Sequence, residues 1–223
     1  MEILRKSDKD IETLIAPRYE EIISLLEKYI AEIELFNPAY GLVGTNDTEV
    51  LVIKHILDSL APLGIIYRLL TKMRSFQAGG IIKAQIADVG SGAGLPGIPL
   101  AIALPQCHVT LIEPMGRRAG FLWNTKASLS LSNITVEERE IEKTGTGPFH
   151  LVCFRAFKPL EPKLLKSLFR VCAEEGFLAA YKGRREKIAE EMSPLENLCS
   201  SWEAIPCPSP FLDEERHLLI IKP

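Results

Sequence analysis

The segment Ile86-Ala87-Asp88-Val89-Gly90-Ser91-Gly92-Ala93-Gly94-Leu95-Pro96-Gly97-Ile98-Pro99 decides the fold of this chain. It begins as a short apolar run, passes through an acid and then places glycines at the alternate positions 90, 92 and 94. An apolar stretch from 95 to 103 comes next and predicts a buried helix. The pattern indicates a strand, a tight turn and a helix N-terminus, where bare glycine backbone lies open to a nucleotide-type cofactor.

Length and composition are those of a folded globular protein. The 223 residues suffice for one α/β domain with a small appendage, and 47% of them are hydrophobic and 25% charged. The charged start Met1–Asp8 has no signal-peptide core and no apolar run approaches a membrane span, so we expect a cytoplasmic protein without membrane contact. The five cysteines lack CxxC spacing, which indicates buried free thiols and no metal site.

The net charge of −3 argues mildly against a nucleic-acid partner, but its distribution leaves room for one. The first 36 residues hold five Lys or Arg and nine Asp or Glu, so the acidic excess is concentrated there. A local basic surface elsewhere on the molecule is still allowed.

The N-terminal third is predicted to be helical. Apolar residues recur at helical spacing from 11 to 36, and Asn37-Pro38 is expected to stop that helix. Asn46-Asp47-Thr48 offers N-caps for a second helix, and a third is expected at about 62–73. We therefore predict a helical cap over residues 1–78, with the linker Gln77-Ala78-Gly79-Gly80 leading into a main domain over 79–223.

Short apolar strands alternate with helical stretches from Ile81 onward. The predicted strands are 85–89, 107–112, 134–137, 151–154, 176–181, 201–205 and 217–222, and the predicted helices are 95–103, 115–128, 160–172 and 184–191. This alternation predicts an α/β fold with a seven-stranded, mostly parallel sheet. The final two strands have no helix between them, so the last strand is expected to be antiparallel.

The glycine turn fits two kinds of cofactor. Gly92 to Gly97 match the GxGxxG pattern of dinucleotide sites, which alone is weak evidence. Asp88 directly before the turn would repel a pyrophosphate but suits the ammonium and sulfonium of S-adenosylmethionine. The glycine spacing and the helix-free final strands also favour S-adenosylmethionine, whereas Glu113, which ends the second strand, would bind ribose hydroxyls in either class.

Several motifs in order resemble those of the RsmG family (glucose-inhibited division protein B), the bacterial methyltransferases that make N7-methylguanosine in 16S ribosomal RNA. The resemblance covers roughly residues 30–223. The chain departs from the family pattern at Phe36 and at Gly41-Leu42-Val43. The motifs are Asn37-Pro38-Ala39-Tyr40-Gly41-Leu42, Lys54-His55-Ile56-Leu57-Asp58-Ser59, Asp88 to Leu100, Arg155-Ala156-Phe157, Tyr181-Lys182-Gly183 and Glu215-Arg216-His217-Leu218.

The resemblance implies a class I S-adenosylmethionine-dependent methyltransferase fold, an rRNA (guanine-N7)-methyltransferase activity and a cofactor site. Its substrate would be 16S ribosomal RNA or a small-subunit particle; the sequence leaves the oligomeric state open, with a monomer expected. Together with the turn, the resemblance implies cofactor contacts from Asp88, Gly90, Gly92, Gly94, Leu95, Glu113, Glu140, Ile141 and Arg155.

The RNA contacts are expected from basic residues at the same sheet edge. Lys182, Arg184 and Arg185 come after a strand and would bind phosphates, although a solvated helix start explains them nearly as well. Arg216 and His217 begin the antiparallel last strand, so Arg216 could reach RNA or the guanine O6. The structural alternative for Arg155 is a surface salt bridge.

Two further residues, His55 and Asp58, lie three apart on one predicted helix face and could hydrogen-bond each other. Such a pair can be purely structural. Guanine N7 carries a lone pair and no proton, so methyl transfer to it needs positioning rather than a general base. A small-molecule methyltransferase and a nucleotide-binding module without catalysis remain the alternatives.

Replacing Gly92 with Val is expected to abolish cofactor binding, because a branched side chain would stand where the ligand meets the backbone. Calorimetry with S-adenosylhomocysteine measures the loss, and NAD serves as the competing ligand. Normal affinity in the variant, or a preference of the native chain for NAD, would refute the role given to the turn.

Overall fold

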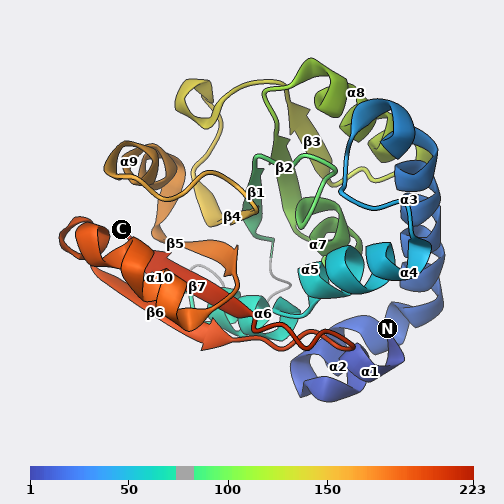
Figure 1. Cartoon of the computed structure of the whole chain (residues 1–223), viewed down its shortest axis with the longest axis horizontal. Coiled ribbons are helices and arrows are strands. Elements are labelled where there is room, and N and C mark those ends of the chain that lie inside the picture. The colour runs from blue at the N-terminus through green and yellow to red at the C-terminus, as the bar shows by residue number, and fades with distance from the viewer. Residues whose placement is uncertain (74–82) are drawn as a thin grey trace.

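The chain is built around one seven-stranded sheet with helices on both faces (Figure 1). The computed structural model describes residues 1–73 and 83–223. The strands are β1 (Gln85–Val89), β2 (His108–Ile112), β3 (Ile134–Glu137), β4 (Phe149–Arg155), β5 (Cys172–Lys182), β6 (Ser201–Pro206) and β7 (His217–Lys222). Their order across the sheet is β3-β2-β1-β4-β5-β7-β6.

The predicted sheet is confirmed, including its unusual last strand. Strands β1 to β5 run parallel, and β7 pairs antiparallel with both β5 and β6. Because Lys182 lies opposite His217, the start of β7 is at the edge where the parallel strands end. Strands β4 and β5 begin earlier than predicted, at Phe149 and Cys172.

Alternating residues along the central strands feed two hydrophobic clusters. Ile86 and Leu151 face the cluster that the N-terminal helices, α7 and α8 cover, whereas Ala87 and Val152 face the cluster beneath α9 and α10. The longer helices are α2 (Lys9–Ile15), α3 (Tyr19–Tyr40), α6 (Leu63–Thr71), α7 (Gly97–Ala103), α8 (Gly116–Ser128), α9 (Pro162–Val171) and α10 (Arg185–Met192). The central strands are therefore buried on both faces, as a parallel sheet requires.

The N-terminal helical region differs from its predicted outline. The single helix expected over 11–36 is interrupted by a 3₁₀ turn at Ala16–Arg18, and Pro38 does not end α3. Proline in the last turn removes only one backbone hydrogen bond, and the helix continues to Tyr40, where Gly41 ends it with a φ of 60°. The Asn37 side chain instead shapes the loop after the helix, since its Oδ1 accepts from Val43 N–H at 2.8 Å.

The second helical region begins as predicted. The Asp47 side chain caps α4 (Thr48–Leu51) by accepting from Val50 N–H at 3.0 Å. A π-helical turn over Val52–Leu57 and the short α5 (Asp58–Leu60) continue the chain. By length and composition alone the run Thr48–Thr71 could cross a membrane, which corrects our sequence expectation, but 56% of its most apolar window is buried inside the protein.

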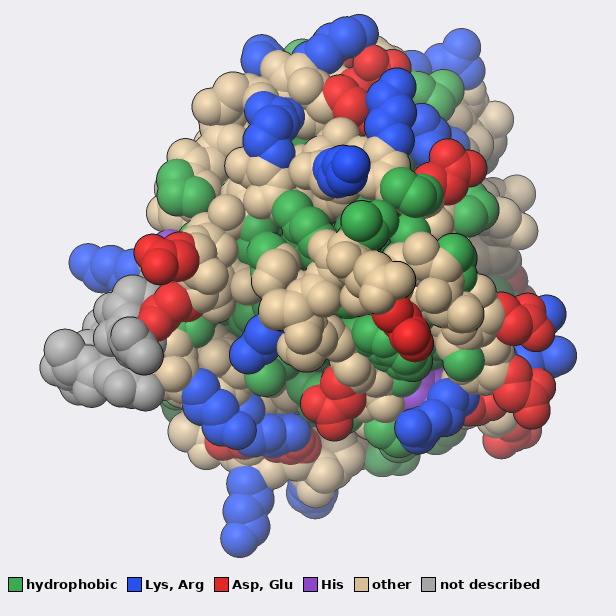
Figure 2. All heavy atoms as spheres, turned by 90° about the vertical axis from the view of Figure 1, so that its left-hand side faces the viewer, with side chains coloured by type: hydrophobic (Ala, Val, Ile, Leu, Met, Phe, Trp, Pro, Cys, Tyr) green, Lys and Arg blue, Asp and Glu red, His purple; other side chains and the backbone are tan. Residues whose placement is uncertain are grey.

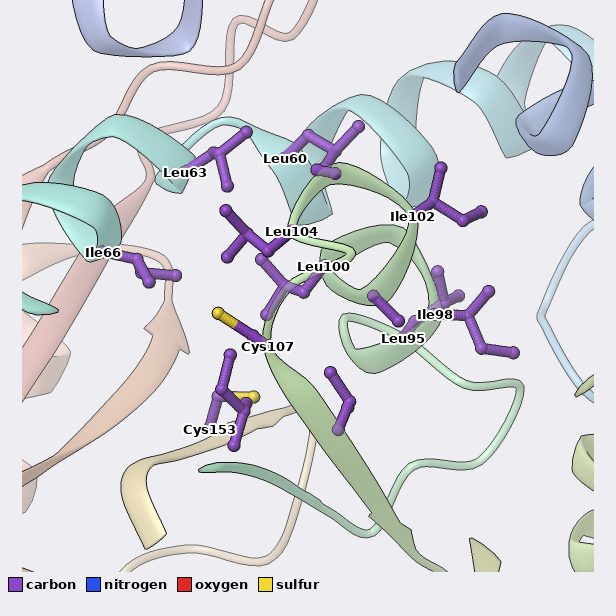
Figure 3. Packing of buried hydrophobic residues seen from close by; sticks show 14 of the residues in the cluster. Leu60, Leu63, Ile66, Leu95, Ile98, Leu100, Ile102, Leu104, Cys107 and Cys153 are labelled. Atoms are coloured by element: carbon purple, nitrogen blue, oxygen red, sulfur yellow. The ribbon is translucent and has the colours of Figure 1, made fainter. Parts of the chain in front are cut away.

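The N-terminal helices share one core with the sheet. Leu60 and Leu63 point toward Leu100 and Leu104 around α7, the helix that comes after the glycine turn (Figure 3). The predicted linker at 77–80 and the boundary between 78 and 79 lie outside the described residues, so the division into cap and main domain stays a prediction. The thiols of Cys107, Cys153 and Cys207 are buried, and those of Cys172 and Cys199 are partly buried.

Truncating Leu60 to Ala is expected to lower the free energy of unfolding by about 2–5 kcal/mol, because the side chain is fully buried and leaves a cavity against α7. Urea denaturation measures the change. The matched control Leu35→Ala removes a side chain that is 72% exposed and should cost no more than about 0.5 kcal/mol. Similar losses in the two variants would contradict this packing.

Candidate active site

The turn after β1 is made by three glycines with positive φ. The φ values are 70° at Gly90, 56° at Gly92 and 90° at Gly94. A Cβ at Gly90 would lie 2.3 Å from Phe157 Cδ2, and one at Gly94 would lie 2.4 Å from Ile98 Cδ1. At Gly92 the nearest atom would be the Gly90 carbonyl oxygen at 3.9 Å, so Gly92 exposes its backbone to open space.

Asp88 lies buried directly before the glycine turn. Its side chain is fully buried, and Oδ2 accepts from Gly97 N–H at 2.9 Å, at the start of α7. Burial raises the pKa of this carboxyl to about 7, with the Gly97 hydrogen bond opposing the shift. Asp88 therefore supports the glycine turn through Oδ2, and its contact with a cofactor stays a prediction.

Glu113 holds the turn from the end of β2. Its Oε2 accepts from Gly92 N–H at 2.8 Å and its Oε1 accepts from Met115 N–H at 3.0 Å. The side chain is buried, while its neighbours Ile112 and Pro114 line a small cavity. A carboxylate has further lone pairs, so these bonds leave acceptor capacity for ribose hydroxyls.

Two cavities meet at Gly90. The larger, of about 280 Å³, is lined by Leu42, Val43, Gly44, His55, Gly90, Ser91, Gly92, Ala93, Leu95, Arg118, Arg155 and Ala156. The smaller, of about 70 Å³, is lined by Val89, Gly90, Ile112, Pro114, Arg139, Glu140, Ile141, Glu142, Phe157 and Lys158. Because Gly90 lines both cavities, they lie side by side at the glycine turn, and we call the two together the groove.

The residues predicted to contact the cofactor distribute over this groove. Leu95 and Arg155 line the larger cavity, and Glu140 and Ile141 line the smaller one. Ile141 is buried, whereas Glu140 is exposed, and the Lys143 ammonium lowers the pKa of the Glu140 carboxyl. Gly94 packs against α7 and α8 side chains instead, and so supports the turn from inside.

Arg155, at the end of β4, is tied to the N-terminal helices. Its Nη1 donates to the Lys54 carbonyl and to Asp58 Oδ2, both at 3.2 Å. Its Nη2 donates to His55 Nδ1 at 3.0 Å. The guanidinium thereby joins the sheet to the π-helical turn, and this is an interior contact rather than a surface salt bridge, since only 13% of the side chain is exposed.

Asp58 binds a second arginine from the other end of the chain. Its Oδ1 accepts from Arg216 Nε at 2.9 Å, and Arg216 Nη2 donates to Glu214 Oε2 at 2.7 Å. In place of the direct bond expected between His55 and Asp58, Arg155 donates a hydrogen bond to each of them, because the guanidinium lies between them. One carboxylate thus fixes arginines from β4 and from the segment before β7.

A third cavity, of about 300 Å³, lies on the other side of Arg155. It is lined by Lys54, His55, Asp58, Arg155, Ala156, Tyr181, Lys182, Gly183 and Arg216. His55, Arg155 and Ala156 line this cavity and the larger cofactor cavity. These three residues therefore form a common wall between a cofactor groove and an adjoining pocket.

The predicted RNA contacts are placed unequally. Lys182 Nζ donates to both carboxylate oxygens of Glu191, at 2.7 and 2.8 Å, and His217 is buried with Nδ1 2.8 Å from the Gly183 carbonyl oxygen. These two side chains thus have protein partners, unlike the solvent-directed groups we expected. Arg184 and Arg185 are exposed at the start of α10.

The side of the molecule that carries α9 and α10 has mixed charge. Figure 2 views the molecule from the left-hand side of Figure 1, where Lys and Arg side chains lie among acidic ones and apolar side chains occupy the middle. Positive and negative side chains are therefore interspersed on this face.

One residue that the sequence did not single out is Tyr29. It lies in the apolar stripe of α3, which gives no sign of a polar role, yet its buried hydroxyl donates to the Ala93 carbonyl at 2.7 Å. Tyr29 therefore connects the N-terminal helices to the cofactor turn.

Phe36, where the chain departs from the family pattern, packs on Tyr40 and Phe121 with ring centroids 5.4 and 5.8 Å away.

The sheet order and the glycine turn define a protein of the class I S-adenosylmethionine-dependent methyltransferase fold. A SAM-dependent methyltransferase from Aquifex aeolicus aligns with a TM-score of 0.54 at 15% identity, covering 74% of this chain and 91% of that one. A putative methyltransferase of the same dependence from Methanococcus maripaludis aligns with a TM-score of 0.52 at 17% identity, covering 78% and 89%.

Sequence similarity identifies the family within this class. The family model described as rRNA small subunit methyltransferase G matches residues 22–219, and the chain belongs to that family. Ribosomal RNA small subunit methyltransferase G of Treponema denticola is 36% identical, covering 92% of this chain and 87% of the relative. The protein of that name from Cellvibrio japonicus is 35% identical, covering 94% and 90%. The resemblance stated from the motifs is confirmed.

Replacing Asp58 with Ala is expected to lower the free energy of unfolding by about 3–5 kcal/mol, because two largely buried guanidinium groups lose their shared carboxylate. Urea denaturation measures it. The control Glu214→Gln alters a carboxylate that is 52% exposed and pairs with the same Arg216, and it should cost much less than the Asp58 substitution. Equal losses would show that burial at Asp58 has no special weight.

Proposed function

We propose that this chain transfers a methyl group from S-adenosylmethionine to N7 of a guanine in 16S ribosomal RNA. The observation that carries the proposal is the wall of His55, Arg155 and Ala156 between two cavities. Because the two cavities adjoin at these residues, a methyl donor in the glycine groove and a base in the adjoining pocket would lie next to each other there. Family membership supplies the ribosomal RNA as the substrate class.

The groove residues would hold the cofactor. Gly90, Gly92 and Leu95 would contact it through the turn, Glu113 would accept from its ribose, and Glu140 with Ile141 would flank its base. When bound, S-adenosylmethionine supplies an electrophilic methyl group on a sulfonium sulfur. Arg155 lines both cavities, so it would hold the methyl donor and the target base in position relative to each other.

The chain's own residues would act by positioning. Guanine N7 has a lone pair and no proton to lose, so alignment of the reacting atoms can supply up to roughly 7–11 kcal/mol of the barrier reduction. His55 suits this chemistry because it is no general base: its Nδ1 already accepts from Arg155. The nearby Asp58 carboxylate would offset the positive charge that the base gains at N7.

The RNA would be gripped outside the pocket. Arg184 and Arg185 are exposed beside it and would bind phosphates, while Lys182 would shape the pocket through its bond to Glu191. We extend the proposal to a cytoplasmic protein that works as a monomer, with residues 1–78 as a cap on the methyltransferase domain 79–223. Free 16S RNA or a small-subunit particle would be the partner.

Incubating the purified chain and S-adenosylmethionine with small subunits from a strain lacking this enzyme class is expected to produce N7-methylguanine at one site. Mass spectrometry of the digested RNA detects it, and the Gly92→Val variant is the inactive control. Subunit RNA without added N7-methylguanine would sink the proposal. Methylation of small molecules alone would favour a small-molecule methyltransferase instead.

A further inference from the structure

His55 stands at the junction of the cofactor groove and the adjoining pocket, with one ring nitrogen fixed. It lies in the π-helical turn Val52–Leu57, and its Nδ1 is 3.0 Å from Arg155 Nη2. A guanidinium only donates hydrogen bonds, so Nδ1 is an acceptor and carries no proton. In the neutral ring the proton must therefore be on Nε2.

The ring is neutral near pH 7. Burial, followed by the positive charges of Arg155 and Lys54, lowers the pKa of His55 from 6.5 to about 4. Within residues 1–73 and 83–223, the Nε2 atom of His55 has no hydrogen-bond partner. The junction therefore carries a neutral N–H donor that the protein itself leaves unused.

The cationic side chains of Arg155, Arg216 and Lys182, which also line the pocket, already have protein partners. Arg155 donates to Lys54, Asp58 and His55, and Arg216 uses Nε, Nη1 and Nη2 on Asp58, the Glu215 carbonyl and Glu214. The Lys182 ammonium is held by both oxygens of Glu191. Within the described chain, the Nε2–H of His55 differs from these cations because it has no protein partner to give up when a base binds.

We infer that His55 recognises the target base by donating from Nε2 to the O6 atom of guanine. On the major-groove edge guanine offers two acceptors, N7 and O6, and N7 must stay free to receive the methyl group. Adenine presents an amino group in place of O6, so it would confront the Nε2–H with a second donor. The inference rests on the proposed function and replaces Arg216, our sequence candidate for O6.

A neutral donor also suits the charge that develops on the substrate. The base becomes cationic as N7 is methylated, and a second cation directly beside it would be unfavourable. A neutral imidazole contributes its hydrogen bond without that repulsion, whereas an arginine or lysine in the same place would not.

Two variants separate base recognition from a purely structural role. His55→Asn keeps an acceptor near the position of Nδ1 for Arg155 but loses the donor, whereas His55→Gln keeps a donor near the position of Nε2. We expect kcat/KM for small-subunit methylation to fall about tenfold in the Asn variant and to stay within about threefold of native in the Gln variant. The control His108→Asn, at the opposite sheet edge, should leave kcat/KM unchanged.

Modified substrates test the atom that His55 contacts. Small subunits are reconstituted with 2-aminopurine, which lacks O6, or with inosine, which keeps it, at the guanine that the native chain methylates. We expect 2-aminopurine to cost the native chain about tenfold and to cost the His55→Asn variant nothing further. Inosine should impose the same small penalty on both proteins.

The failures of the two proposals are distinguishable. If the native chain methylates subunits but the Asn variant keeps full activity, or its penalty adds to that of 2-aminopurine, the role of His55 is overturned while the proposed function stands. Weakened S-adenosylhomocysteine binding or a lowered melting temperature in the Asn variant would also overturn it. No methylation by the native chain would overturn both.

Discussion

The Asp58 carboxylate, clamped between Arg155 and Arg216, is the interaction on which the arrangement of the site depends. It joins the helical region to the end of β4 and to the segment before β7, three parts of the chain that are far apart in sequence. A buried carboxylate with two guanidinium partners keeps its geometry because releasing either partner leaves charge unpaired. The wall between the two cavities is fixed by the same contacts.

The N-terminal helices are therefore part of the site and not only a cover over the sheet. They supply His55 and Asp58 to the pocket and Leu42, Val43 and Gly44 to the cofactor groove. Their apolar side chains pack on α7, which starts at the turn itself. The sheet alone would leave the pocket without one side, because His55 and Asp58 both come from the N-terminal region.

Much of the sheet could be predicted from the sequence, since strand periodicity and glycine spacing are local signals. The antiparallel β7 was predictable from the missing helix before it, and the place of Arg155 was predictable from the end of its strand. Leu95 and Ile141 were assigned to the cofactor site from the family resemblance, and both line the cavities. The partners of Lys182 and Asp88 could not be predicted, because Glu191 and Gly97 meet them only through tertiary packing. The helix end predicted at Pro38 was wrong, because the free-energy cost of a proline depends on how much of the helix remains after it.

The hydrogen bond from Tyr29 to the Ala93 carbonyl carries one more consequence. This bond couples the packing of α3 against the rest of the fold to the conformation of the glycine turn. If the packing of α3 raises ligand affinity by some factor, thermodynamic reciprocity requires that the bound ligand raises the equilibrium constant for the packing of α3 by the same factor. Ligand binding in the glycine groove would therefore stabilise the packing of α3, a helix that begins at Tyr19 on the outside of the fold.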